Sequence, residues 1–363
     1  MSSSLLKRWA RKYFSDPEAL ILVVLLALGF AVVLFLGNTL TPVFASVVIA
    51  YLLEAAVTWL TRRGVPRLLA VFLVFCLFLT FLLFLFFGLV PLLSKQVTQL
   101  AQELPKMIAV GQHLLQVLPE RYPQFFSIQQ AAEMAASIRS GVTSFGQNLL
   151  SLSLSSLPHL FTLALYLVLV PVMVFFFLKD KEHLHDVLSR YLPRERGVAT
   201  RVWVEMDQQI GNYIRGKITE ILLVGLVSVV TFAALGLKYA MLLGALVGLS
   251  VVVPYIGAIA VTVPVVLIAY YQWGPTREFA YLFGAYMVIQ ILDGNLVVPW
   301  LFSEAVNLHP IAIIVAVLVF GGVWGFWGVF FAIPLATLVM AVIHAWPRAT
   351  DEGEHPTGGA SPA

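Results

Sequence analysis

Long apolar runs, separated by short polar and basic segments, dominate the pattern along the chain. A helix of about 20 apolar residues crosses the hydrocarbon core of a bilayer. Six runs have roughly this length: residues 19–36, 39–60, 68–93, 157–178, 218–237 and 279–301. We expect a tight turn at Gly37 and Asn38 between the first two, and a helix start at Pro17. The pattern predicts an all-α polytopic membrane protein.

Two further apolar runs, residues 239–271 and 310–344, are too long for one span and too short for two spans with a turn. Half-segments of about 15 residues reach only about 22 Å, whereas the hydrocarbon core is about 30 Å thick. We therefore expect re-entrant helical hairpins, with two short, tilted spans in each run as the alternative. Helix breakers mark both midpoints: Pro254, Tyr255 and Gly257, then Gly321, Gly322, Gly325 and Gly328.

The two broken runs also resemble each other in the spacing of their breakers, and each follows one spanning helix. This arrangement is typical of an inverted repeat, in which the broken elements meet at a substrate site near the membrane midplane. With these two runs the prediction is about eight membrane segments.

Residues 94–156 differ in character, because apolar residues recur at steps of three and four, as at Val97, Leu100, Leu104 and Ile108. Such steps predict amphipathic helices, here a small extramembrane hairpin. Its apolar faces either pack on each other or pair with another subunit. The same spacing at residues 198–213 predicts a helix along the membrane surface before the fifth span.

Lysine and arginine predict the orientation, since they collect on the cytoplasmic side of a membrane. Residues 1–18, 61–67, 179–217 and 346–363 hold four, three, eight and one of the 22 basic residues. We therefore expect cytoplasmic termini and a periplasmic 94–156 segment. The predicted divisions are 1–93 (N-terminal segment and spans 1–3), 94–156 (extracytoplasmic helices), 157–217 (span 4 and cytoplasmic amphipathic helices), 218–345 (transport core) and 346–363 (disordered tail).

The composition agrees with a membrane protein, since 60% of the residues are hydrophobic and 11% are charged, against about 25% charged in soluble domains. No basic block of the kind that binds nucleic acid is present. Cys76 is the single cysteine, and no nucleotide-binding or hydrolase motif occurs. We predict no enzymatic activity, no metal and no cofactor, and therefore secondary, facilitated or channel-like transport.

Polar residues within apolar sequence are the candidates for function, because an ionisable group at membrane depth is costly. Asp293 and Asn295 flank Gly294, and Gln290 lies one helical turn earlier. These groups could coordinate a cation, or Asp293 could carry a proton. The alternative to a functional role is that the Asp293 carboxylate caps a helix break. Glu304, Asn307 and His309 form either a polar patch at the inner mouth or an ordinary loop, and Glu54 is interpreted as structural.

Several of these motifs together resemble the autoinducer-2 exporter family of permeases and its PerM-like branch. The motifs are Asp293-Gly294-Asn295, Pro299, residues 302–310, Phe320-Gly321-Gly322, residues 325–328, Pro334, residues 344–347 and the turn at 254–257. The resemblance implies a bacterial inner-membrane permease that forms homo-oligomers. Members of the family have been linked to export of a furanosyl signal and to sodium–proton antiport.

We therefore predict a permease in the lipid bilayer that moves a small polar solute or a cation by alternating access around Asp293, Asn295 and the two breaks. Two alternatives remain. One is a sodium or other cation–proton antiporter in which Asp293 titrates. The other is a scaffold that transports nothing and acts through residues 94–156.

Overall fold

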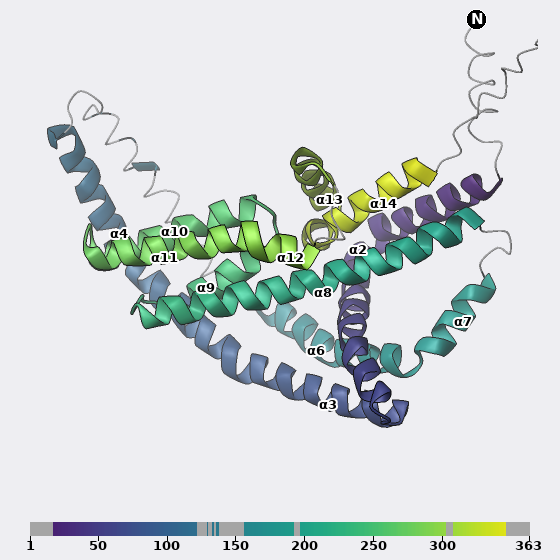
Figure 1. Ribbon diagram of the computed structural model, residues 1–363. Coiled ribbons are helices and arrows are strands. Elements are labelled where there is room, and N and C mark those ends of the chain that lie inside the picture. Colours follow the sequence, from purple (N-terminus) through teal and green to yellow (C-terminus); the bar gives the residue numbers. More distant parts are fainter. Residues whose placement is uncertain are drawn as a thin grey trace, which may run out of the picture. The chain divides into compact units, whose positions relative to one another are not determined.

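The computed structural model describes residues 17–121, 156–191, 197–302 and 308–345, together with residues 129, 133, 136 and 137. The regular structure of these residues is entirely helical (Figure 1). The chain forms two compact units, which are described separately below. The larger unit contains residues 39–186 and 211–305, and the smaller unit contains residues 1–38, 187–210 and 306–363.

Seven helical segments of the described residues are long and apolar enough to cross a membrane: Thr39–Arg62, Arg67–Gln112, Thr162–Lys179, Asp207–Ala234, Ile256–Trp273, Arg277–Phe302 and Pro310–Phe330. Their outward side chains are apolar, and Phe87, Ile259 and Leu226 are 72%, 71% and 65% exposed. Such surfaces need hydrocarbon around them. The predicted polytopic α-helical membrane protein is confirmed.

Helix α2 (Pro17–Arg62) begins at the predicted residue and continues without interruption for 46 residues. The predicted turn at Gly37 and Asn38 is wrong, because both residues are helical. Gly37 has a packing role instead. A Cβ atom there would lie 2.7 Å from the indole Nε1 of Trp324, within the smaller unit, so the glycine makes room for that ring.

Helix α3 (Arg67–Phe84), the π-helical turn η1 (Leu85–Leu89) and α4 (Val90–Arg121) form one continuous helical stretch. The expected boundary between residues 93 and 94 therefore falls inside a helix. Residues of the amphipathic stripe on α4, among them Val97 and Leu100, pack against the core of α8 to α11. Of the second half of the predicted hairpin, from Met134 to Leu149, the structure describes only residues 136 and 137.

A second core joins the 39–62 part of α2 with α3 and α6 (Ser156–Lys179), the predicted fourth span. Glu54 lies at the polar end of this core. Its carboxylate forms ion pairs of 3.2 Å with Arg67 and with Lys181, the first residue of α7 (Lys181–Tyr191). These two ion pairs give Glu54 the structural role that was predicted for it.

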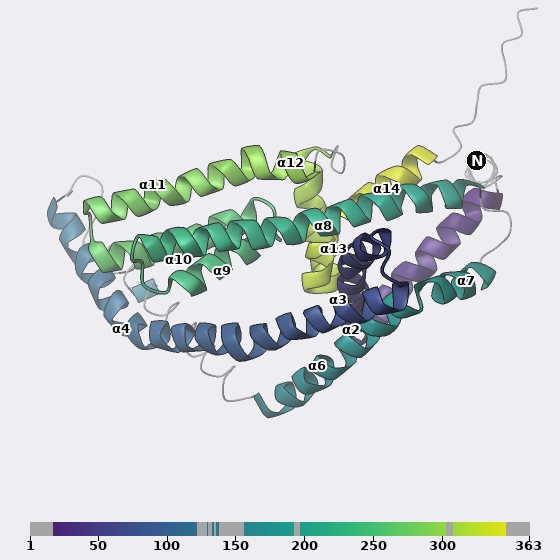
Figure 2. The same ribbon diagram turned by 60° about the horizontal axis from the view of Figure 1, so that its bottom comes forward.

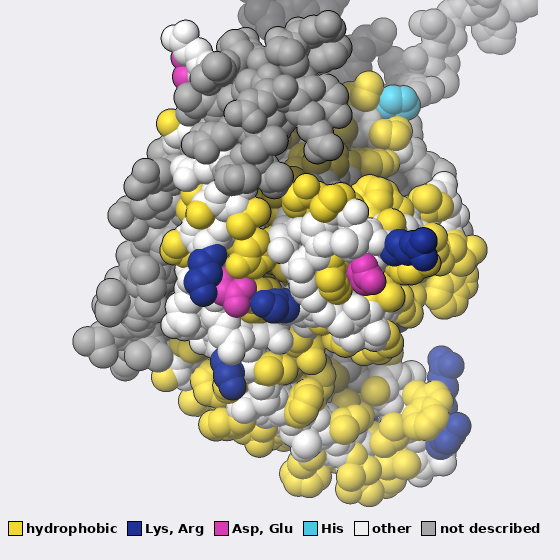
Figure 3. Space-filling view, turned by 90° about the vertical axis from the view of Figure 1, so that its left-hand side faces the viewer, with side chains coloured by type: hydrophobic (Ala, Val, Ile, Leu, Met, Phe, Trp, Pro, Cys, Tyr) yellow, Lys and Arg dark blue, Asp and Glu magenta, His cyan; other side chains and the backbone are white. Residues whose placement is uncertain are grey.

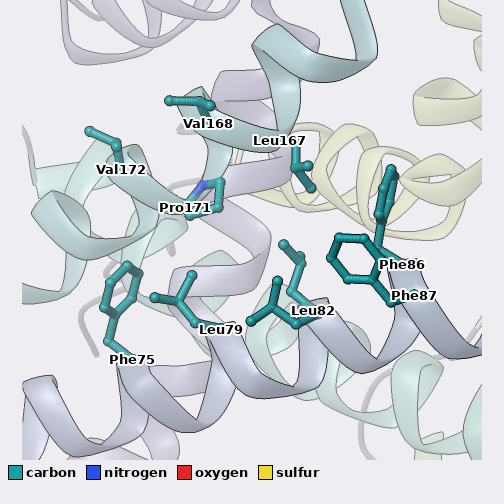
Figure 4. A pocket seen from close by; sticks show the side chains of 10 residues that line it. Phe75, Leu79, Leu82, Phe86, Phe87, Leu167, Val168, Pro171 and Val172 are labelled. Carbon is teal, nitrogen blue, oxygen red and sulfur yellow. The ribbon is translucent and has the colours of Figure 1, made fainter. Parts of the chain in front are cut away.

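An apolar cleft of about 380 Å³ opens between the α3–η1 stretch and α6, where Pro171 interrupts the backbone hydrogen bonds of α6 (Figure 4). Its lining side chains are all alkyl or aromatic: Phe75, Leu79, Leu82, Leu83, Phe86, Phe87, Leu167, Val168, Pro171 and Val172. A polar solute would find no hydrogen-bond partner among these side chains. A pathway for such a solute must lie elsewhere.

Helix α8 (Gly197–Ala234) is also continuous, so the expected surface helix and the fifth span are one element. Figures 1 and 2 both show it beside α9 (Ala240–Ser250), α10 (Ile256–Trp273) and α11 (Arg277–Leu292). The fully buried side chains of Phe232, Leu243 and Tyr286 hold these four helices together. The span that begins with α11 continues through the π-helical turn η2 (Asp293–Val297) into α12 (Val298–Phe302).

The first predicted break is present between α9 and α10. Tyr255 has a positive φ of 62°, and a Cβ atom on Gly257 would collide with the carbonyl oxygen of Ser250. The turn therefore depends on glycine at position 257. The two arms are unequal, because α9 has 11 residues and α10 has 18. At 1.5 Å per residue, α9 covers only about 16 Å, roughly half of the hydrocarbon core.

The second predicted break is present in α13 (Pro310–Phe330), where Gly325 adopts a φ of 59° and a ψ of −134°. The chain reverses there, and a Cβ atom on Gly328 would collide with the carbonyl group of Phe320. Helix α14 (Ala332–Ala345) then packs along α13. Helices are thus interrupted at Tyr255 and at Gly325, while Gly321 and Gly322 are helical. The re-entrant placement of the two segments in the membrane stays a prediction.

Acidic and basic side chains lie in a band across the middle of the face shown in Figure 3, with further basic side chains at its lower right edge, and hydrophobic side chains lie between and around them. One of the ion pairs of the larger unit, Lys238 with Glu103, joins the loop before α9 to α4 at 3.7 Å. Polar helix ends and apolar flanks are what a bundle needs when its ends meet water and its sides meet lipid.

Helices α8 and α9 approach closely at a G-x-x-x-G pattern formed by Gly244 and Gly248. The Cα atom of Gly225 on α8 lies 2.7 Å from the place a Cβ atom of Gly248 would occupy. Small residues at such crossings bring two backbones together and supply the dispersion contacts that hold helices in lipid.

We predict that Gly248→Ala destabilises the protein by about 1–3 kcal/mol, because the new methyl group meets backbone atoms that cannot yield without separating the helices. The nearest is the carbonyl oxygen of Ile221, at 2.6 Å. Thermal unfolding of the full chain in detergent measures the effect. Gly284→Ala on α11 is the matched control, since nothing lies within 4 Å of its added carbon. Equal unfolding temperatures for both variants would contradict the packing role.

Candidate functional site

A buried ion pair lies inside the apolar helix bundle of the larger unit. Lys217 and Glu220 are only 4% and 2% exposed, and both belong to the membrane-spanning part of α8. The Lys217 ammonium donates a hydrogen bond of 2.7 Å to Oε2 of Glu220, one turn further along the helix. Removing two charges from water is costly, so a pair at this depth needs additional partners or a function.

Lys217 has a further partner at the first hairpin. Its Nζ atom donates a hydrogen bond of 2.8 Å to the carbonyl oxygen of Val251, the residue that caps the C-terminal end of α9. The last carbonyl groups of a helix have no partner within the helix and carry partial negative charge. A lysine is well suited to this position. One ammonium group thus connects α8, its carboxylate and the turn that separates α9 from α10.

Asp293 supplies a third charged group. It begins the π-helical turn η2, and its charge acts on both Lys217 and Glu220. Among the described residues, its Oδ1 atom is buried without a hydrogen-bond partner. π-helical turns are rare and often mark functional sites. The turn η1 contains only apolar residues and a glycine, so it is the carboxylate that distinguishes η2.

Aromatic rings lie beside Lys217. The ammonium of Lys217 lies 5.3 Å from the ring centroid of Phe302, and the ring of Tyr213 packs on Phe302 at 5.7 Å. Gly216 faces the same ring, and a Cβ atom there would lie 2.9 Å from it. A low-dielectric wall of this kind strengthens each electrostatic interaction inside it.

The charges of the three side chains do not balance. When all are ionised, one lysine faces two carboxylates and the site carries one negative charge. A buried carboxylate oxygen without a partner is unfavourable, and a proton or another cation at the site removes the imbalance. The arrangement is therefore suited to binding one positive charge, or the cationic part of a polar solute.

The structure supports only part of the predicted residue set. It brings Asp293 to the charged cluster. The exposed Asn295 instead donates a hydrogen bond of 2.9 Å from its side-chain amide to the backbone carbonyl oxygen of Ile291. Gln290 is half-buried on α11, and its backbone carbonyl oxygen accepts a hydrogen bond from the backbone amide of Asp293. His309 caps α13, where its Nδ1 atom accepts from the amide of Ile311 at 3.3 Å. Glu304 and Asn307 lie outside the described residues.

Sequence reasoning missed Lys217 and Glu220. Lys217 was counted with the basic residues of the cytoplasmic segment 179–217, and the fifth span was expected to begin directly after it. The spacing of three between a lysine and a glutamate at the edge of an apolar run was the available signal, because it places opposite charges on one helix face.

We predict that Lys217→Met lowers the free energy of unfolding by about 3–5 kcal/mol, because it leaves two carboxylates buried without a counter-charge. The neutral triple variant Lys217→Met/Glu220→Gln/Asp293→Asn should recover most of this loss. Lys181→Met is the control, since Lys181 belongs to an exposed pair with Glu54, which is worth at most about 1 kcal/mol. Denaturation of the purified chain compares the variants, and a loss for Lys217→Met as small as that of the control would contradict the site.

Comparison with known proteins agrees with this architecture. The chain is 49% identical over 343 residues to PerM of Escherichia coli (strain K12), which is named as a permease, and the alignment covers 94% of this chain and 97% of PerM. It is 26% identical over 314 residues to YueF of Bacillus subtilis (strain 168), which is named as a transport protein, with 85% and 84% of the two chains covered.

The family profile described as AI-2E family transporter matches residues 20–348, nearly the whole chain. This range contains both hairpin breaks and the three charged residues of the candidate site. The chain therefore belongs to the AI-2E transporter family, and its function is that of a membrane permease.

Proposed function

We propose that this permease moves a small polar solute across the bacterial inner membrane by alternating access at the first hairpin. The observation that supports this most strongly is the buried pair of Lys217 and Glu220, bonded to the end of α9. The proposed substrate contacts are these two side chains and Asp293, with Gln290 and Asn295 on the approach. Glu304, Asn307 and His309 are proposed to line the inner mouth.

The physical reason lies in the place of the charges. A stable apolar bundle has no need of a lysine and two carboxylates, since apolar side chains of similar volume would pack as well or better. The desolvation cost of these charged side chains is explained if they replace the hydration shell of a polar solute within the membrane. The hairpin turn beside them provides freed carbonyl groups and an element that can change position.

The proposed orientation follows the basic residues of segments 61–67 and 179–217, which we place in the cytoplasm with the C-terminus. Residues 94–156 would then face the periplasm. The expected cytoplasmic N-terminus depended on a turn at Gly37 and Asn38, but α2 is one continuous helix. A helix that crosses the membrane once has its ends on opposite sides, so α2 does not support placing both the N-terminus and segment 61–67 in the cytoplasm. A homo-oligomer is proposed because the family resemblance implies one.

The scaffold alternative is less well supported. It requires the amphipathic 94–156 segment to present an apolar face to a partner, but the described stripe on α4 already packs against the core of α8 to α11. Gln96 further ties this helix to the core, because its Oε1 atom accepts from the amide of Leu242 at 2.8 Å.

We predict that Asp293→Asn slows solute flux by about tenfold or more, since one interaction with a charged group is worth about 1.5–3 kcal/mol. Proteoliposomes carrying the full chain are mixed with solutions of single small sugars, polyols or amino acids. Stopped-flow light scattering then follows the vesicle volume, whose rate of recovery measures the entry of each solute. Glu54→Gln, which changes a structural carboxylate, should keep the wild-type rate. A wild-type rate equal to that of empty liposomes, or an unaffected Asp293→Asn variant, would argue against the proposal.

A further prediction concerns the depth and wetness of the two turns. In a Cys76→Ser background, Ile256→Cys and Phe326→Cys should react with membrane-impermeant maleimides, because both turns are proposed to face an aqueous cleft near mid-membrane depth. These side chains are 45% and 57% exposed, and neither substitution touches the tightly packed Gly257 or the positive φ of Gly325. Leu77→Cys, at a residue 69% exposed on α3, is the lipid-facing control. Turns as unreactive as this control would count against a wet cleft.

A further inference from the structure

The contacts of Lys217 suggest more than a binding site. Its ammonium group donates hydrogen bonds to two acceptors, the carboxylate of Glu220 on its own helix and the backbone carbonyl group of Val251 at the hairpin. Asp293, whose Oδ1 atom is buried without a hydrogen-bond partner among the described residues, interacts electrostatically with the same ammonium. Any change in charge among the carboxylates must therefore alter how strongly Lys217 holds the hairpin.

We propose that Glu220 and Asp293 bind one exchangeable proton between them, and that Lys217 transmits its binding to the first hairpin through the carbonyl oxygen of Val251. This inference rests on the proposed function, because it assigns a coupling step to the same site. The proton is taken up from water by a carboxylate oxygen and returned to water, with no other bond made or broken.

With the proton bound, the cluster holds one ammonium and one carboxylate, and Lys217 is free to donate to Val251 as the structure shows. Without it, two carboxylates compete for the same ammonium in a low-dielectric site. Lys217 is then drawn toward Asp293, and the bond to Val251 weakens. The carbonyl at the end of α9 loses its partner, and the hairpin is released from α8.

The neighbouring helices offer few other groups that could carry this proton. On α8, Tyr213 interacts with Glu220, and Arg215 lies on the exposed side with its guanidinium 5.7 Å from the ring centroid of Tyr51 on α2. The turn between α9 and α10 contributes the exposed Tyr255 and the backbone of Val251. On α12, the neighbour is the uncharged ring of Phe302. Of the described groups facing Lys217, the two carboxylates are the acidic ones.

The test reads the hairpin directly and needs no transported solute. An environment-sensitive fluorophore is attached to Ile256→Cys in a Cys76→Ser background of the full chain, reconstituted in liposomes. Emission is recorded from about pH 5 to about pH 9, a range that covers the titrations documented for buried carboxyl groups. We expect a single step with the steepness of one proton.

The variants separate the parts of this mechanism. Glu220→Gln and Asp293→Asn each leave one lysine and one carboxylate, so the step should be lost. Lys217→Met should also lose it, because the link to Val251 is gone. Asp293→Glu and Lys217→Arg keep the chemistry and should retain the step with a shifted midpoint, which shows that loss in the other variants is not misfolding. Glu54→Gln, which changes a paired carboxylate away from the hairpin, should leave the step unchanged.

The outcomes distinguish this inference from the proposed function. A wild-type protein whose emission shows no step, or a step that persists in both Glu220→Gln and Asp293→Asn, would overturn the proton mechanism even if solute flux is normal. A step that persists in Lys217→Met would overturn the role of the lysine. A step that behaves as expected in a protein without solute flux would support the proton mechanism and contradict the permease assignment of this site.

Discussion

The hydrogen bonds of Lys217 are the interaction on which the rest of the candidate site depends. Within hydrocarbon, every polar group must find a partner inside the protein, because water is absent. Lys217 satisfies the carboxylate of Glu220 and the terminal carbonyl of α9 at the same time. The surrounding structure serves this arrangement: Gly216 leaves space for Phe302, and Phe302 and Tyr213 close the site.

Close backbone approach is the second constraint. The hairpin can reach Lys217 because α9 lies directly against α8, through Gly225 and Gly248. The turn itself is short, because Gly257 allows the start of α10 to touch the end of α9. Glycines therefore position the charged site although none of them carries any of its chemistry. Larger side chains at these positions would move the carbonyl of Val251 away from its ammonium partner.

The same physics explains why the apolar cleft beside Pro171 and the charged site have different roles. The cleft is lined by carbon alone and offers nothing to a polar solute, whereas the charged site offers donors and acceptors but only within an enclosing bundle. A permease needs both kinds of surface, one compatible with lipid and one compatible with its passenger. Helices α8 to α11 present the lipid-compatible surface on their outside and the solute-compatible surface between them.

The sequence by itself determined the membrane class, most of the spans and the places where the two helices break, and it indicated Asp293 as a candidate site residue. These features are local: run length, breakers and an acidic residue in apolar sequence can be read without knowing which helices touch. It failed at Gly37 and Asn38, and at the junctions near residues 93 and 217, because helix continuity depends on what packs against a residue as much as on its own propensity. Trp324 against Gly37 is such a contact.

Only the tertiary structure decided which charges form the site. Lys217 and Glu220 are close to each other in sequence, but they are far from Val251 and Asp293, and no local pattern indicates that these four residues meet. Asn295 and His309 illustrate the converse, since their polar groups turn to nearby backbone atoms of their own segments. The physical reason is that the desolvation free energy of each polar group depends on how deeply the group is buried. Burial is set by how the helices pack and cannot be read from the local sequence.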